Sequence, residues 1–215
     1  GLDGGRIGWI DGGGDEAHPW AGQLGAQIIQ LDDNRLISGD FEDLEVIVAG
    51  GFAGGTRPLN RSMQHIRPWI ESGGHFVSQY HRPIDNWDKT QSTPLRLQPG
   101  SPSIRWRVTD AAAPVQMLQP DHPLLNSPNN ITGEDFDGWI KERGLYFASE
   151  WDPDYVPLLA MSDASEAPLE GGLLAARIGA GSHVHCALNL FYQMDHMVVG
   201  AFRLFANLLT PFGRT

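Results

Sequence analysis

The stretch Gly73-Gly74-His75-Phe76-Val77-Ser78-Gln79-Tyr80-His81-Arg82-Pro83 decides the fold prediction. Its apolar run from His75 to Gln79 is typical of a buried strand, and the glycine pair before it can adopt the positive φ of a tight turn. Tyr80, His81 and Arg82 follow the strand directly, and all three side chains can do chemistry. Ligands in open α/β sheets bind beyond the carboxyl ends of the strands, so this turn is the first candidate site.

The turn lacks a good nucleophile. A Cys or Ser here would form a nucleophile elbow, the sharp corner after a strand that presents an attacking atom. The turn carries Tyr80 instead, and a tyrosine with its ordinary pKa of about 10 attacks poorly at neutral pH. Ser78 lies within the strand, and the single cysteine, Cys186, lies in an apolar run where a buried, inert thiol is expected. The sequence therefore predicts no nucleophilic catalysis here.

Further strands and helices surround this element. The predicted strands before it lie at 6–10, 27–31 and 45–49, and the predicted helices between them at 18–26 and 61–72. This alternation indicates right-handed crossovers and a doubly wound sheet. Later short runs favour a β-ribbon excursion at 95–97, 105–109 and 115–118, strands at 145–148, 156–161, 172–178 and 183–190, and a closing helix at 197–209. We expect an α/β fold, a flavodoxin-like three-layer sandwich with a mostly parallel sheet and the ribbon after the elbow strand.

Composition bounds the class of protein. The 215 residues, 41% of them hydrophobic, suffice for one sizeable core, and no repeat or linker divides them. We expect a single domain over residues 1–215, and the start on Gly1 without a methionine indicates a piece of a larger protein. The formal charge of −11 argues against nucleic-acid binding, and no run of about 20 apolar residues predicts a membrane span.

The loop after the elbow strand is the densest group of polar and aromatic side chains. His81, Arg82, Asp85 and Trp87 at a strand's carboxyl end suit a polar ligand such as a sugar, with the indole as a stacking face. In the alternative interpretation, Arg82 and Asp85 pair with each other and Trp87 covers the edge of the sheet. Both interpretations remain open from the sequence.

Two other regions supply weaker candidates. The glycine-rich segment 11–16 lacks the P-loop lysine, and its acidic residues would repel a phosphate, so a tight turn is expected there; Asp15 and Glu16 are retained as candidate ligand-binding residues. Glu150 follows a predicted strand and becomes a possible general base if it reaches the same crevice.

His183 and His185 lie two apart on a predicted strand and therefore face the same side of the sheet. Such a pair could ligate a metal, but no third ligand follows at a useful spacing. Structural histidines are the preferred interpretation, and no metal or cofactor is predicted.

Several of these motifs together resemble a known family. The strand 74–79 with its elbow, Asp121-His122-Pro123, the Glu150-Trp151 pair, and the segment 181–189 before an apolar closing helix are similar to the class I glutamine-amidotransferase-like fold, especially its ThuA-like branch. The runs 80–88, 93–110 and 183–207 resemble the module attached to bacterial PIG-L (LmbE-like) deacetylases.

The resemblance also implies a loss of activity. Active members use an elbow cysteine and a late-strand histidine to hydrolyse glutamine, and these positions fall on Tyr80 and near Leu190. It implies a non-catalytic, cytoplasmic module that binds a sugar-like ligand or a neighbouring N-acetyl-sugar deacetylase domain through the elbow crevice. The alternatives are a hydrolase of carbohydrate-like substrates that uses His81 or Glu150 with Arg82, and a purely architectural domain.

Overall fold

A seven-stranded sheet forms the centre of the computed structural model, which describes residues 2, 4–13 and 17–212. The strand order is β2-β1-β3-β4-β11-β10-β8. The first five strands in this order are parallel, and β10 and β8 follow as antiparallel additions. The strands of the sheet are β1 (Arg6–Ile10), β2 (Gln27–Gln30), β3 (Val46–Ala49), β4 (His75–Gln79), β8 (Val156–Pro157), β10 (Leu173–Ile178) and β11 (Gly181–Cys186).

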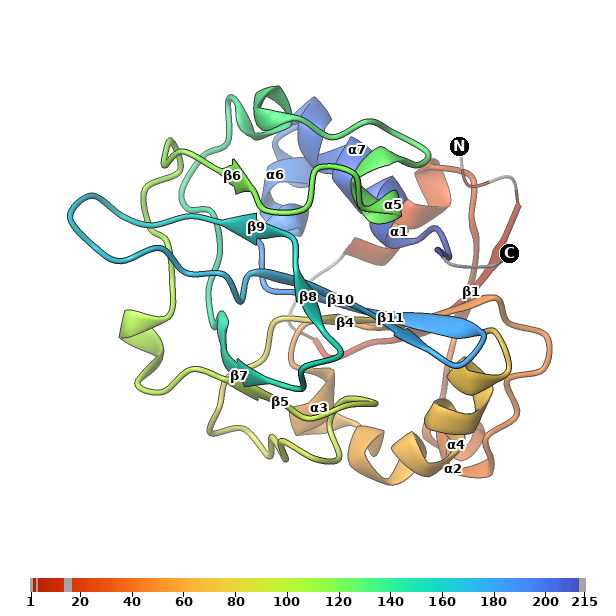
Figure 1. Cartoon of the computed structure of the whole chain (residues 1–215). Coiled ribbons are helices and arrows are strands. Elements are labelled where there is room, and N and C mark those ends of the chain that lie inside the picture. The colour runs from red at the N-terminus through yellow and green to blue at the C-terminus, as the bar shows by residue number, and fades with distance from the viewer. Residues whose placement is uncertain (1, 3, 14–16, 213–215) are drawn as a thin grey trace.

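Helices cover both faces of the sheet, which makes three layers (Figure 1). On one side lie α1 (Ala17–Gln23), α5 (Pro123–Asn126), α6 (Leu190–Asp195) and α7 (Val199–Leu208). On the other side lie α2 (Asp33–Ser38), α3 (Ala53–Thr56) and α4 (Leu59–Glu71). The predicted flavodoxin-like sandwich with a mostly parallel sheet is confirmed.

The central strands are apolar on both faces, as a sheet covered by two helical layers requires. Successive residues of β3 alternate between two separate clusters: Val46 and Val48 pack towards α1 and α7, whereas Ile47 and Ala49 pack towards α2 and α4. Phe76 and Val77 of β4 divide in the same way. The pairing register of the buried strands therefore fixes which residues lie at the carboxyl edge of the sheet.

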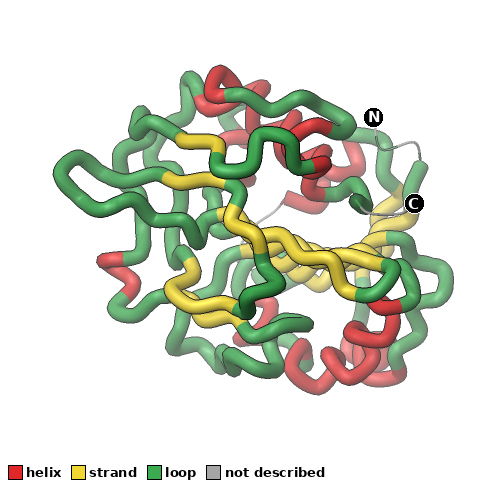
Figure 2. Tube along the Cα trace, in the orientation of Figure 1, coloured by secondary structure: helices red, strands yellow, loops and turns green. Residues whose placement is uncertain are grey.

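The elbow strand β4 has the bounds that its sequence predicts, and it lies between β3 and β11 in the middle of the sheet. Gly73 has a φ of +120°, which confirms the positive φ expected before this strand. Beyond Gln79 the chain forms a long loop up to β5 (Leu97–Pro99), drawn as a continuous loop in Figure 2.

The excursion after this loop differs from a β-ribbon. Its short strands pair with late segments and not with each other: β5 pairs with β7 (Ala148–Trp151), and β6 (Gln116–Met117) pairs with β9 (Leu159–Ala160). The predicted strand at 105–109 is wrong, because a 3₁₀ turn ends at Arg105 and only Val108 forms an isolated bridge, to Gly144. Pairing over long sequence separations leaves no local signal of this kind.

Three predicted strands also change their bounds, and one of them, 156–161, divides into β8 and β9, which belong to different sheets. The segment 145–147 is not extended strand, and β7 begins at Ala148. The run 183–190 divides into β11, which ends at Cys186, and α6, which begins at Leu190. No helix among the described residues is long and apolar enough to span a membrane.

Candidate functional site

Three parallel strands deliver side chains to one point at the carboxyl edge of the sheet. Tyr80 follows β4, Phe52 follows β3, and Asn189 follows β11. The backbone N–H of Phe52 donates to the carbonyl of Tyr80 at 3.3 Å, which ties the first two strand ends together. This is the position at which α/β sheets bind ligands.

A crevice of about 160 Å³ opens at this point. Its lining residues are Phe52, Tyr80, Lys141, Glu142, Leu145, Tyr146, Ala187, Asn189 and Phe191. The aromatic rings make a continuous wall, since the Tyr80 ring lies 5.2 Å from that of Phe52, 6.3 Å from that of Tyr146 and 6.2 Å from that of Phe191. The predicted elbow residue Tyr80 therefore faces a real cavity.

The polar part of the crevice is a buried Glu142–Asn189 pair. Asn189 Nδ2 donates to Glu142 Oε1 at 2.7 Å, and both residues are buried. Asn189 Oδ1 is buried and has no hydrogen-bond partner within the described chain. Buried polar atoms are nearly always hydrogen-bonded, so this acceptor is an exception that a ligand or a water would explain.

Further hydrogen bonds around this pair hold it in place. Gln193, which is fully buried on α6, accepts from Ile140 N and donates to Ile140 O, both at 2.9 Å. The Asn189 N–H donates to Arg143 O at 2.9 Å, and the buried Arg143 guanidinium donates to the carbonyls of Ala113 and Phe136. The loop that carries Glu142 is therefore rigidly supported.

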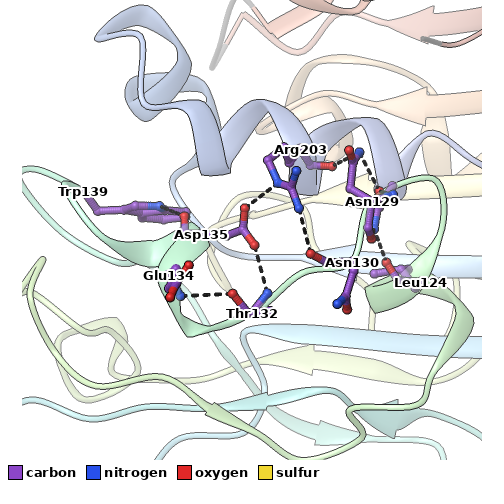
Figure 3. A network of polar contacts seen from close by, with 9 residues as sticks. Leu124, Asn129, Asn130, Thr132, Glu134, Asp135, Trp139 and Arg203 are labelled. Carbon is purple, nitrogen blue, oxygen red and sulfur yellow. Dashed lines mark hydrogen bonds and ion pairs between the residues drawn. The ribbon is translucent and has the colours of Figure 1, made fainter.

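The same loop is fastened to α7 further upstream (Figure 3). Arg203 donates to Asp135 Oδ1 and to the carbonyl of Asn130, both at 2.7 Å. Asp135 also accepts from Thr132 N at 2.8 Å. Asn129 donates to the Arg203 carbonyl at 3.1 Å, so hydrogen bonds hold the segment from Asn129 to Asp135 against α7.

Backbone strain concentrates around the crevice. Phe52, Lys141 and Tyr146 line it, and all three have φ between +59° and +69° although none is glycine. Tyr80 is not among the positive-φ residues of the described chain, so it lacks the strained geometry typical of a nucleophile elbow. Strained residues persist where surrounding structure over-determines them, frequently at ligand sites.

The predicted loop residues lie beside the crevice and do not line it. Arg82 forms an ion pair with Asp85, and its guanidinium lies over the Phe52 ring, 4.9 Å from the centroid. Trp87 packs on His81 and donates its indole N–H to Leu97 O at 2.9 Å. These contacts match the interpretation in which Arg82 pairs with Asp85, whereas Trp87 packs against the cluster of Leu97, Ala148 and Leu174 and does not cover an edge of the central sheet.

His81 is buried against Phe52 and Trp87, and this burial lowers its pKa. Glu150 lies on β7 at the surface and pairs with Arg96 at 3.3 Å. No hydrogen bond or ion pair between described residues joins Glu150 to His81 or Arg82. Asp15 and Glu16 lie outside the described residues.

The paired histidines belong to a buried polar chain. Ser78 Oγ lies 2.9 Å from His183 Nε2 and 2.8 Å from His185 Nδ1, and Tyr155 Oη lies 2.7 Å from His183 Nδ1. Burial lowers the pKa of both histidines, that of His185 to about 3. Three of their four ring nitrogens thus bind side chains of neighbouring strands and loops, as structural histidines would.

Cys186 is expected to resist alkylation in the folded protein. It lies buried on β11, and burial raises the pKa of its thiol to about 12. Only the thiolate reacts, so iodoacetamide at pH 8 should modify the native chain at least about a hundredfold more slowly than the urea-unfolded chain. Mass spectrometry after timed quenching measures both rates, and equal rates would contradict the buried position.

Sequence reasoning missed most of the crevice. Phe52 follows a predicted strand, so its position at the carboxyl edge was accessible from the pattern, whereas Asn189 fell inside the predicted strand 183–190. Glu142 and Tyr146 gave no such signal, because long-range bridges of Gly144 to Val108 and to Leu188 bring their loop to the sheet. Phe191 lies on α6, a helix that the sequence did not predict.

Comparison with solved structures places the fold among known ones. A cytoplasmic protein of Salmonella typhimurium matches with a TM-score of 0.64 and 12% identity, covering 95% of this chain and 96% of that chain. A protein of Bacteroides uniformis described as ThuA-like matches with a TM-score of 0.55 and 12% identity, covering 94% and 91%. A protein of Thermoplasma acidophilum described as a GMP synthase component matches with a TM-score of 0.54 and 11% identity, covering 95% and 94%.

At the level of sequence, no protein-family model and no curated protein matches this chain. Structural likeness at such low identity speaks to the fold alone. The chain has the fold of glutamine-amidotransferase-like and ThuA-like proteins.

Proposed function

We propose that this chain is a non-catalytic, glutamine-amidotransferase-like binding module that holds a small ligand in the crevice beside Tyr80. The observation that carries the proposal is the orphaned, buried Asn189 Oδ1 in a preformed crevice at the carboxyl edge of β4. Around this acceptor the chain offers rings, an amide and a carboxylate, but neither a cysteine nor a histidine among the described residues lines the cavity.

The wider biological setting remains part of the proposal. The resemblance to modules of PIG-L deacetylases suggests a neighbouring N-acetyl-sugar deacetylase as partner, and a cytoplasmic location. The hydrolase alternative finds no support in contacts, since Glu150 pairs with Arg96 at the surface and His81 is enclosed by aromatic rings. An architectural role would require a buried water to satisfy this acceptor.

The purified chain is expected to release no ammonia from glutamine above the buffer rate. Tyr80 occupies the elbow, and the only thiol is buried with a raised pKa, so the described residues offer no activated nucleophile at this turn. A coupled glutamate dehydrogenase assay measures this directly. Hydrolysis that disappears in Tyr80→Phe or Cys186→Ala would refute the non-catalytic assignment.

Thermal unfolding in the presence of N-acetylated sugars, glutamine and small amines tests the binding function. A true ligand stabilises the native state by about 2.7 kcal/mol at a hundredfold excess over its Kd. The double variant Arg82→Ala, Asp85→Ala removes the surface ion pair beside the crevice and should keep the shift, because neither residue lines the cavity. Loss of the shift in that variant would move the site to the loop, and no shift with any compound would refute the binding function.

A further inference from the structure

The buried polar pair of the crevice has one acceptor, Asn189 Oδ1, that receives no hydrogen bond from the described chain. A carboxylate accepts only, so the hydrogen bond to Glu142 fixes Asn189 Nδ2 on that side and leaves Oδ1 as the orphan. Asn189 is also the N-cap of α6, where an Asn normally uses its Oδ1 to cap the first turn. This Oδ1 makes no capping bond either, so it is a buried acceptor whose capacity is unused within the described chain.

The charge of Glu142 is uncompensated as well. No ion pair within the described chain reaches Glu142, although it is only 8% exposed. The neighbouring cations are engaged elsewhere: the Lys141 ammonium lies over the Tyr192 ring at 4.6 Å, and the Arg143 guanidinium binds backbone carbonyls. A buried carboxylate that has a hydrogen bond but no cationic partner is costly, and a cationic ligand would reduce that cost.

The walls suit the same ligand. Phe52, Tyr80, Tyr146 and Phe191 line the same crevice as the acceptor pair, and the Arg82 guanidinium already lies over one face of the Phe52 ring. Ring faces attract cations, and quaternary ammonium groups are recognised by cages of such rings. A neutral sugar could donate to Asn189, but it would leave the Glu142 charge unpaired.

We infer that the crevice binds a small alkylammonium ion, held by the Glu142–Asn189 acceptors below and the four rings around it. The inference rests on the proposed binding function and names its ligand class. A volume of about 160 Å³ is roughly that of five water molecules in the liquid and lies below the range of drug-sized ligands. A compact ion of the size of choline therefore fits better than an oligosaccharide.

Choline and its neutral carbon isostere, 3,3-dimethylbutan-1-ol, form the decisive ligand pair. Both have the same shape and the same hydroxyl, which is the group that can donate to Asn189 Oδ1, and only choline has the charge. Isothermal titration calorimetry at low salt, together with thermal unfolding, should show choline binding at least about tenfold more tightly than the isostere. Equal affinities would overturn the inference.

Matched variants separate the crevice from the acidic surface, since a chain of net charge −11 attracts any cation weakly. Glu142→Gln keeps the acceptor to Asn189 and removes the charge, and it should weaken choline at least about tenfold. Glu166→Gln makes the same charge change on an exposed turn and should leave the affinity within about twofold. Equal losses in both variants would overturn the inference by assigning binding to the general field.

Phe191→Leu keeps an apolar wall and removes one ring, so it should weaken choline and leave the isostere unchanged. This variant retains the test if Glu142→Gln fails to fold. Binding of N-acetylglucosamine or glutamine that is lost in Tyr80→Ala, with no preference for choline, would overturn the ammonium ligand and keep the binding module. Absence of binding by every compound would overturn both.

Discussion

Acidification from pH 7 to pH 5 is expected to lower the free energy of unfolding by several kcal/mol. His183 and His185 are fully buried, and burial lowers the pKa of both, that of His185 to about 3. Histidine in the unfolded chain has a pKa of about 6.5, so between these two values the unfolded state binds a proton that the folded state excludes. Stability is therefore complete above about pH 6.5 and falls as the pH falls through this window.

The loss of stability at pH 5 follows from the difference between this pH and the pKa of histidine in the unfolded chain. His185 alone costs about 2 kcal/mol there, and His183 and His81 act in the same direction. Carboxylates with lowered pKa values, such as Asp88 and Asp163, lose their contribution only at more acidic pH. Between pH 7 and pH 5 the change in the free energy of unfolding therefore reports on the histidines.

Urea unfolding at the two pH values measures the effect, and His185→Gln tests its origin. The variant loses stability at pH 7 because Ser78 loses a partner, but its pH dependence should be smaller by about 2 kcal/mol. His196→Gln is the matched control, since His196 is exposed and hydrated in both states. The weakening charge repulsion of an acidic chain affects all three proteins alike. An unchanged pH dependence in His185→Gln would contradict the role of this burial.

The strands of the sheet centre were predictable because each is specified within its own few residues. The runs 6–10 and 75–79 are bounded by glycine or polar residues, and the structure begins and ends β1 and β4 there. Buried parallel strands carry continuous apolar sequence, which gives a strong local signal. The carboxyl-edge position of Tyr80 followed from the same reasoning.

The crevice was not predictable in this way, because its parts meet only through the tertiary fold. Glu142 and Asn189 are 47 residues apart; the Glu142 carbonyl accepts from Gln193, and the Asn189 N–H donates to the Arg143 carbonyl. The start of α6 was hidden too. Its N-cap residue, Asn189, uses its amide on Glu142, and the aromatic residues after it extend the apolar pattern of β11. Because the Asn189 side chain bonds to Glu142 and does not cap the first turn, it did not reveal where α6 begins.

Replacing Asn207 by Leu is expected to destabilise the protein by about 3 kcal/mol or more. Asn207 is fully buried on α7, and its Nδ2 donates to the carbonyls of Leu124 and Asn129 at 2.8 and 2.7 Å. Its Oδ1 accepts from Asn129 N and Nδ2 at 2.9 and 3.0 Å. Leucine keeps the volume but leaves the buried Leu124 carbonyl and two backbone groups of the half-buried Asn129 without partners, each of which costs about 1–3 kcal/mol when water cannot replace the bond. For a chain of this size the melting temperature should fall by about 6–12 °C.

Asn126→Leu is the matched control for this prediction. Asn126 also donates to two backbone carbonyls, those of Pro120 at 2.7 Å and His122 at 3.0 Å, but it is exposed. Water can replace the lost donors there, so the cost should stay at about 1 kcal/mol or below. Because the segment that Asn207 holds leads into the crevice loop, Asn207→Leu should also speed amide exchange between residues 124 and 136, measured by mass spectrometry. Equal losses of stability in the two variants would mean that the buried hydrogen bonds of Asn207 contribute no more than the hydrated ones of Asn126. The contacts of α7 would then not be what supports the crevice loop.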